Sequence, residues 1–175
     1  TMPKTVERLK KVQGVANEIA TIVQQLMTFA RKGEVNVREF PLDSFVKEFS
    51  KLADHIVPED INLSIDFERA HFPCQGDAES LQESLLSIIQ NAVDAAVDTR
   101  ESQIRLGLKI FDSDSPSVWV NQYPMLKEGK YAQITIWDNG GGIDKNHLEK
   151  VFDPFFTTKH LGSGLGLAVA IGNIK

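Results

Sequence analysis

Two glycine-rich turns near the end of the chain bracket a cluster of aromatic and basic side chains. The first turn follows Asp138 as Gly140-Gly141-Gly142, and the second is Gly162-Ser163-Gly164-Leu165-Gly166-Leu167. A helix that begins in a glycine-rich loop presents unpaired backbone N–H groups, and the missing side chains let an anion approach the backbone. The second turn therefore predicts a cradle for phosphate oxygens, with Leu165 and Leu167 anchoring the helix start. Taken alone, such a string more commonly marks a turn or a helix cap.

Asp138 stands where the apolar run Ile134 to Trp137 gives way to the first turn. A carboxylate accepts hydrogen bonds, and adenine presents an amino donor where guanine presents a carbonyl acceptor. An acceptor here can therefore select adenine. The competing interpretation is an ordinary Asp-Asn-Gly turn between strands.

Three further side chains suit a magnesium nucleotide. Asn91 offers an amide oxygen, a hard ligand for Mg²⁺. Asp94 follows on the same face of a predicted helix and can reach the metal through water. Lys159, beside Thr157 and Thr158, is a mobile cation suited to contacting phosphate from a flexible lid. Each of them can equally be a solvated surface side chain.

A heptad seam of apolar side chains runs through the first 30 residues: Leu9, Val12, Ala16, Ile19, Val23, Leu26 and Ala30. Such a seam is typical of a helix that packs on another helix in a coiled coil or four-helix bundle, and it favours a homodimer through this helix. The alternative is an amphipathic helix that lies on its own domain. Arg31-Lys32-Gly33 predicts the end of the helix.

Downstream, helical and strand periods alternate. Helices are expected at 42–56, from an N-cap near Asp77 onward, at 144–151 and at 165–174. The inner side of the second is assigned to Leu81, Leu85, Ile88, Ala92 and Ala95. Strands are expected at 61–67, 104–110 and 132–136, with the last two antiparallel, and 36–41 is a connector or an edge strand. The segment 112–130 is long for a hairpin connection.

Composition limits the class of protein. The 175 residues are 42% hydrophobic, enough for one core plus an appendage, and the net charge of -5 argues against a nucleic-acid-binding surface. Cys74 is the only cysteine, which excludes a disulfide within the chain and favours a reducing, cytoplasmic setting. No apolar stretch approaches the roughly 20 residues that span a bilayer, so we expect any membrane anchor to lie outside this sequence.

Four motifs in this order resemble the GHKL superfamily. Ser84 to Ala96 resembles its asparagine box, Asp138 to Ile143 its first glycine box, Phe152 to Lys159 its phenylalanine box, and Gly162 to Leu167 its second glycine box. The sequence Asp-Pro-Phe-Phe-Thr-Thr-Lys at 153–159 resembles the motif of sensor histidine kinases of two-component systems rather than that of topoisomerases, chaperones or mismatch-repair ATPases. The resemblance runs from Val35 to the end, and the heptad helix resembles the second helix of the kinase dimerisation and phosphotransfer bundle.

The resemblance implies a fold and a division of the chain. The fold is α/β, a two-layer α/β sandwich with a mixed sheet, preceded by one long coiled-coil or bundle helix. Residues 1–33 would be the second helix of the dimerisation hairpin, and 34–175 the ATP-binding catalytic domain. The family adds a closing strand pair where this sequence ends, which indicates a trimmed domain or one whose last strands lie elsewhere.

The resemblance also implies ATP and Mg²⁺ as cofactors. Asn91 would ligate the metal, Asp138 would hold the adenine amino group with Gly142 leaving room for the ring, and Ile143 and Ala95 would line the pocket. Phe155 and Lys159 would belong to the lid. The full set expected to contact nucleotide is Asn91, Asp94, Ala95, Asp138, Gly140, Gly142, Ile143, Phe155, Thr158, Lys159, Gly162, Ser163, Gly164, Leu165, Gly166 and Leu167.

Two positions depart from the family pattern. Ser87 stands where hydrolysing members carry a glutamate that activates water, and a serine hydroxyl is a poor base, so ATP hydrolysis is disfavoured. Asp94 stands where many kinases carry a lysine or arginine, which removes an expected phosphate contact. The phosphoacceptor is missing as well, since no histidine lies in the heptad helix; the histidines are His55, His71, His147 and His160.

The function that this resemblance implies is a protein kinase core. The chain would donate the γ-phosphate of Mg-ATP to a histidine outside this sequence, for relay to an aspartate of a response regulator receiver domain. A nucleotide-binding interaction module without phosphotransfer is the alternative, supported by Ser87 and Asp94. A GHKL ATPase is disfavoured by Ser87.

Overall fold

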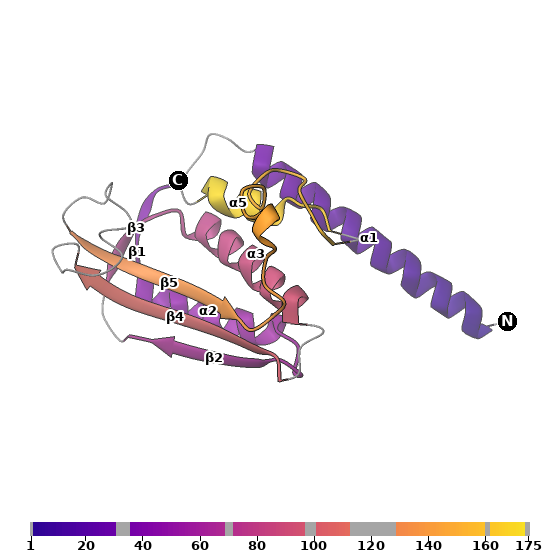
Figure 1. Cartoon of the computed structure of the whole chain (residues 1–175), viewed down its shortest axis with the longest axis horizontal. Coiled ribbons are helices and arrows are strands. Elements are labelled where there is room, and N and C mark those ends of the chain that lie inside the picture. The colour runs from indigo at the N-terminus through magenta and orange to yellow at the C-terminus, as the bar shows by residue number, and fades with distance from the viewer. Residues whose placement is uncertain are drawn as a thin grey trace.

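The computed structural model describes residues 2–30, 36–68, 72–96, 101–112, 129–159 and 162–173. A long helix extends away from an α/β body in which helices lie against the strands and the last helix packs on other helices (Figure 1). The described elements, in chain order, are α1 (Met2–Ala30), β1 (Arg38–Pro41), α2 (Leu42–Ile56), β2 (Asn62–Phe67), β3 (Pro73–Gly76), α3 (Ala78–Ala96), β4 (Gln103–Asp112), β5 (Lys130–Asp138), the 3₁₀ turn η1 (Lys145–His147) and α5 (Gly166–Asn173).

The main sheet has the strand order β2-β4-β5 and is mixed, as expected. β2 pairs parallel with β4, with Ile65 beside Leu106, and β4 pairs antiparallel with β5, with Ile104 beside Asp138. The predicted antiparallel pair is therefore confirmed. Its register sets Asp138 at the end of β5 that lies beside the start of β4, so the first glycine turn leaves the sheet there.

A second, two-stranded sheet pairs β1 with β3 in antiparallel register, with Phe40 beside Cys74. This makes 36–41 an edge strand rather than a plain connector. Strand β3 was not predicted, because Pro73 and Gly76 bound a segment of only four residues and both residue types are poor strand formers.

The core lies between α2, α3 and the inner face of the main sheet. Phe49 of α2, Ile89 of α3 and Ile104 of β4 are each 2% exposed or less and belong to one cluster. This two-layer arrangement confirms the expected sandwich. Ile65 of β2 does not join it fully, since its side chain is 41% exposed on an edge strand.

The buried stripe of α3 differs from the expected one. The side chains that α3 buries are Ser84, Leu85, Ile89, Ala92, Val93 and Ala96. Ile88 and Ala95, assigned to the inner side, are only half-buried, and Leu81 is too. The reason is that α3 covers the sheet with one face and contacts α5 as well, so its apolar surface is wider than a single stripe.

The caps of two elements agree with the sequence, although one element is shorter than expected. Asp77 Oδ1 accepts hydrogen bonds from the backbone N–H groups of Glu79 and Ser80, at 3.1 and 3.2 Å, which confirms the N-cap of α3. Asp144 caps η1 by accepting from the Asn146 N–H at 2.8 Å. The expected helix 144–151 was wrong in length, because only the 3₁₀ turn η1 forms there.

Four apolar side chains of the α1 seam are exposed. Leu9, Val12, Ile19 and Val23 are 63%, 66%, 56% and 48% exposed. The predicted helix is confirmed, while its expected end at 31–33 lies outside the described residues, as does the connection 113–128. Among the helices described, none is both long enough and apolar enough to cross a membrane.

Candidate functional site

Asp138 is held by the turn that follows it. Its Oδ1 accepts a hydrogen bond from the Gly140 N–H at 2.9 Å, and its side chain is half-buried. Within the described residues, Oδ2 accepts no hydrogen bond. One carboxylate oxygen is thus committed to the turn, and the other is left to meet a donor from outside.

Asn139 joins the same turn to the start of β4. Its Oδ1 accepts from the Gln103 N–H at 2.8 Å, its Nδ2 donates to the Glu101 carbonyl oxygen at 3.1 Å, and its own N–H donates to the Gln103 carbonyl oxygen at 3.2 Å. The Asp-Asn-Gly segment therefore forms the ordinary turn that the sequence also allowed, and it fixes the direction of Asp138.

Gly140 rests directly on the last turn of α3. A Cβ atom at this position would lie 2.5 Å from the carbonyl oxygen of Ala95 and 2.7 Å from its Cβ, so only glycine fits. Gly142 has a φ of +70°, which favours glycine as well. Ala95, one of the expected site residues, is brought to the turn, whereas Ile143 is 55% exposed beyond it.

The second glycine turn packs against the segment Phe152 to Lys159, called the lid below. The Phe155 N–H donates to the Gly164 carbonyl oxygen at 2.9 Å. Gly164 has a φ of +65°, and a Cβ on it would lie 2.6 Å from the Phe155 carbonyl oxygen. Leu165 is 1% exposed and anchors the start of α5 as predicted, while Leu167 is half-buried. The Phe155 side chain, 65% exposed, points away from any core.

Ser87 has a packing role that sequence reasoning missed. A Cβ at Gly166 would lie 2.6 Å from Ser87 Oγ and 3.7 Å from Asn91 Nδ2. The two α3 side chains therefore lie directly beneath the first residue of α5. A small residue at position 87 follows from this contact, and the spacing of Ser87 and Asn91, one helical turn apart, was the signal available in the sequence.

Lys159 connects the lid to α3. Its Nζ lies 2.9 Å from Asn91 Oδ1 and 2.6 Å from Asp94 Oδ2. The other Asp94 oxygen accepts from Gln90 Nε2 at 3.0 Å. The structure thus brings Lys159 to two expected site residues, Asn91 and Asp94, which lie 68 and 65 positions before it in the sequence. Thr158, by contrast, is exposed and makes no contact among the described residues that bears on the site.

These residues fit a magnesium nucleotide. Asn91 Oδ1 already accepts a hydrogen bond from the Lys159 ammonium. An amide oxygen is also a hard ligand of the kind that Mg²⁺ prefers. A Cβ on Gly162, Gly164 or Gly166 would lie 2.5, 2.4 or 2.6 Å from another protein atom, so these glycines let the second turn pack closely on the lid and on α3. Among the described residues, no three histidine, cysteine or carboxylate side chains cluster as a protein-only metal site, so phosphates and water would supply most of the ligands.

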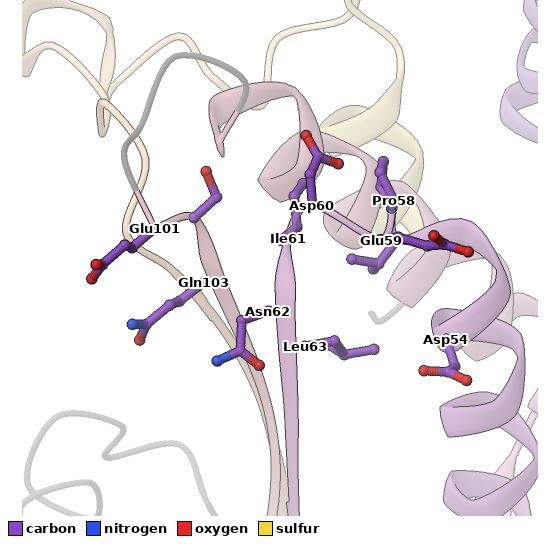
Figure 2. A pocket seen from close by; sticks show the side chains of 11 residues that line it. Asp54, Pro58, Glu59, Asp60, Ile61, Asn62, Leu63, Glu101 and Gln103 are labelled. Carbon is purple, nitrogen blue, oxygen red and sulfur yellow. The ribbon is translucent and has the colours of Figure 1, made fainter.

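A separate pocket lies where β2 and β4 begin, at the same end of the main sheet as Asp138, and its lining is acidic. It has a volume of about 740 Å³, and it is lined by the end of α2 and the starts of β2 and β4. Figure 2 shows the carboxylates of Asp54, Glu59, Asp60 and Glu101 around it. Grouped carboxylates repel phosphate. None of its lining residues belongs to the set expected to contact nucleotide, so this pocket is distinct from the expected site.

Comparison with known proteins points to one family. The family model described as "Histidine kinase-, DNA gyrase B-, and HSP90-like ATPase" matches residues 76–173, a range that holds all four motifs. Sensor kinase CckA of Brucella abortus (strain 2308) is 32% identical over 162 residues, which cover 91% of this chain and 17% of CckA. Signal transduction histidine-protein kinase AtoS of Escherichia coli (strain K12) is 32% identical over 165 residues, 94% of this chain and 24% of AtoS. The chain therefore spans about a fifth of the length of these curated relatives.

Solved structures share the fold. Full-length ShkA in complex with AMPPNP superposes with a TM-score of 0.69 at 18% identity, covering 91% of this chain and 31% of ShkA. The catalytic domain of histidine kinase ThkA gives a TM-score of 0.59 at 23% identity, with 79% of this chain and 80% of ThkA covered. At these identities the likeness concerns the fold alone, and it agrees with the sandwich described above.

Proposed function

The chain belongs to the family of histidine kinase-, DNA gyrase B- and HSP90-like ATPases, and from this premise we propose that it is the ATP-binding catalytic core of a sensor histidine kinase. Residues 34–175 are proposed as the catalytic domain and residues 1–33 as the second helix of its dimerisation and phosphotransfer hairpin. The observation that carries the proposal is the meeting of Asn91, Asp94 and Lys159 between the two glycine turns.

Each part of the site has a proposed task. Asp138 Oδ2 accepts the adenine amino group, because Oδ1 is taken by the Gly140 N–H. The N–H groups at the start of α5 face the phosphate oxygens. Asn91 is the proposed ligand for Mg²⁺, which when bound neutralises phosphate charge during transfer. The set proposed to contact nucleotide is the one expected from the sequence.

Ser87 supports transfer to a protein acceptor rather than to water. Its hydroxyl lies beneath Gly166 and is a poor base at neutral pH, so the chain has no carboxylate at this position to activate water. No histidine is present in residues 1–54. We therefore propose that the acceptor is a histidine on another helix and that the phosphoryl group passes on to a response regulator receiver domain.

A transfer assay tests this function. A separately produced helical bundle from a histidine kinase relative, with its histidine intact, is mixed with this chain and γ-labelled ATP. We expect label on the bundle and none held stably by the chain itself, and we expect Asn91→Ala to abolish the labelling. ATP binding without transfer to any such bundle would instead support the alternative, a nucleotide-binding interaction module.

The exposed seam of α1 supports a homodimer. Leu9, Val12 and Ile19 project large apolar side chains into solvent, each more than half exposed. Burying such a stripe against a second copy is the arrangement typical of heptad helices. Val12→Asp would place a charge in that contact, and we expect it to shift the chain from dimer to monomer in sedimentation velocity without changing its ATP affinity. A wild-type chain that stays monomeric at high concentration would contradict the dimer.

A further inference from the structure

Helix α3 presents two oxygens to a single cation. Asn91 and Asp94 lie on the same face of the helix, three residues apart, and both contact Lys159 Nζ, at 2.9 and 2.6 Å. Gln90 holds the second Asp94 oxygen at 3.0 Å and so orients the carboxylate from its own helix. The two oxygens therefore form a small cation site on α3 that Lys159 fills.

The lid that carries Lys159 is attached at a second point. The Phe155 N–H donates to the Gly164 carbonyl oxygen at 2.9 Å, and the Lys159 N–H donates to Thr157 Oγ1 at 3.1 Å. The first bond holds the middle of the lid to the second glycine turn, and the contact with Asp94 holds its end to α3. When both contacts are made, Lys159 at the end of the lid donates a hydrogen bond to Asn91 Oδ1.

An ammonium and a metal ion compete for this oxygen. A Mg²⁺ ligand lies about 2.0–2.1 Å from the metal, and Lys159 Nζ already lies 2.9 Å from Asn91 Oδ1. If both were bound, the two cations would lie no more than about 5 Å apart, where like charges repel. Binding of Mg²⁺ to Asn91 therefore weakens the hold of Lys159 on the same oxygen.

We propose that Asn91 and Asp94 form one cation site for which Lys159 and Mg²⁺ compete, so that the Lys159–Asp94 ion pair holds the lid on α3 until the metal nucleotide binds. The identity of the competing metal rests on the proposed function. The ion pair itself does not. Asp94, where many of the kinases that this chain resembles carry a basic residue, thereby acts as the partner of Lys159 and as a positioning residue for the lid.

Hydrogen exchange of the nucleotide-free chain tests the ion pair. Lys159 and Asp94 are 42% and 37% exposed, so the contact is a partly solvated one, and we expect Asp94→Asn and Lys159→Met each to speed exchange in the lid peptide by about twofold to fivefold. The double variant should exchange no faster than either single one, because both remove the same contact. Glu83→Gln on α3 and Lys150→Gln before the lid are the matched controls. Unchanged exchange in the two variants, or effects that simply add, would overturn the ion pair.

A Mg²⁺ titration of the ADP-bound chain, followed by the same lid exchange, tests the competition. Lys159→Met should lower the Mg²⁺ concentration at the midpoint by about twofold to fivefold, because the competitor is gone, and Asp94→Asn should raise it, because an oxygen of the site loses its charge. A midpoint that moves in the same direction in both variants would overturn the shared site. A wild-type chain that binds no nucleotide would refute the proposed function and the metal competition, while the first experiment would still decide the ion pair.

Discussion

Replacing Asp138 by asparagine will remove most of the affinity for ATP and shift the preference of the chain toward guanine nucleotides. The Gly140 N–H occupies Oδ1 at 2.9 Å, so an asparagine that keeps this bond must turn its amide NH₂ outward. That donor meets the adenine amino group, which is also a donor, and it matches the guanine carbonyl oxygen instead. A hydrogen bond to a charged acceptor contributes about 1.5–3 kcal/mol, so we expect about a 10- to 150-fold weaker ATP affinity by calorimetry.

Calorimetry with GTP tests the expected shift in base preference. Affinity for GTP should rise or stay constant while affinity for ATP falls, and the melting temperature should hardly move, because the bond to Gly140 is kept. Asp66→Asn on β2 makes the same change of charge on an exposed side chain away from the turn and should leave both affinities as they were. Undiminished ATP binding by a folded Asp138→Asn protein would refute the adenine assignment.

Phe49→Ala will destabilise the domain more than any surface change. Phe49 is 2% exposed, and its ring stacks on Phe45 with centroids 6.2 Å apart. It joins α2 to the cluster that holds Ile89 and Ile104. Truncating a buried phenylalanine costs about 3–5 kcal/mol through lost burial and the cavity left behind. This is a large share of the roughly 5–15 kcal/mol that separates folded from unfolded domains, and urea unfolding measures it.

Phe152→Ala provides the matched control for that experiment. The Phe152 side chain is 48% exposed, so the same truncation should change the free energy of unfolding by no more than about 0.5 kcal/mol. Similar losses from the two variants would show that Phe49 is not part of the cooperative core. Neither variant touches the residues proposed to bind nucleotide most directly, so unfolding can be read apart from binding.

Periodicity alone predicted the elements that carry a long, regular pattern. The alternation in 104–110 and 132–136 became β4 and β5, and the apolar positions from Leu42 became α2. Such patterns persist because one face is buried along the whole element. Strand β3 and the 3₁₀ turn η1 are too short to show a period, and nothing in the sequence distinguished a buried α3 stripe through Ile89 from one through Ile88.

The sequence named the residues of the proposed site, but it did not predict the contacts among them. The order of the motifs indicated that Asn91 and Lys159 share a nucleotide site, but their spacing along the chain says nothing of which atoms meet. The ion pair of Lys159 with Asp94 depends on how the lid folds back over α3. Ser87 was considered only as a missing base, although its hydroxyl lies beneath Gly166. Both facts arise from packing between segments that are distant in sequence.

The contact between Gly140 and Ala95 would limit which nucleotides fit the proposed site. Ala95 lies one turn beyond Asn91 on α3, and Gly140 follows Asp138 closely, so the base acceptor and the proposed metal ligand are mounted on one continuous support. The span between them is set before any nucleotide arrives. A bound nucleotide would therefore have to match a fixed distance between the adenine acceptor and the metal ligand. Only the lid would then distinguish a diphosphate from a triphosphate.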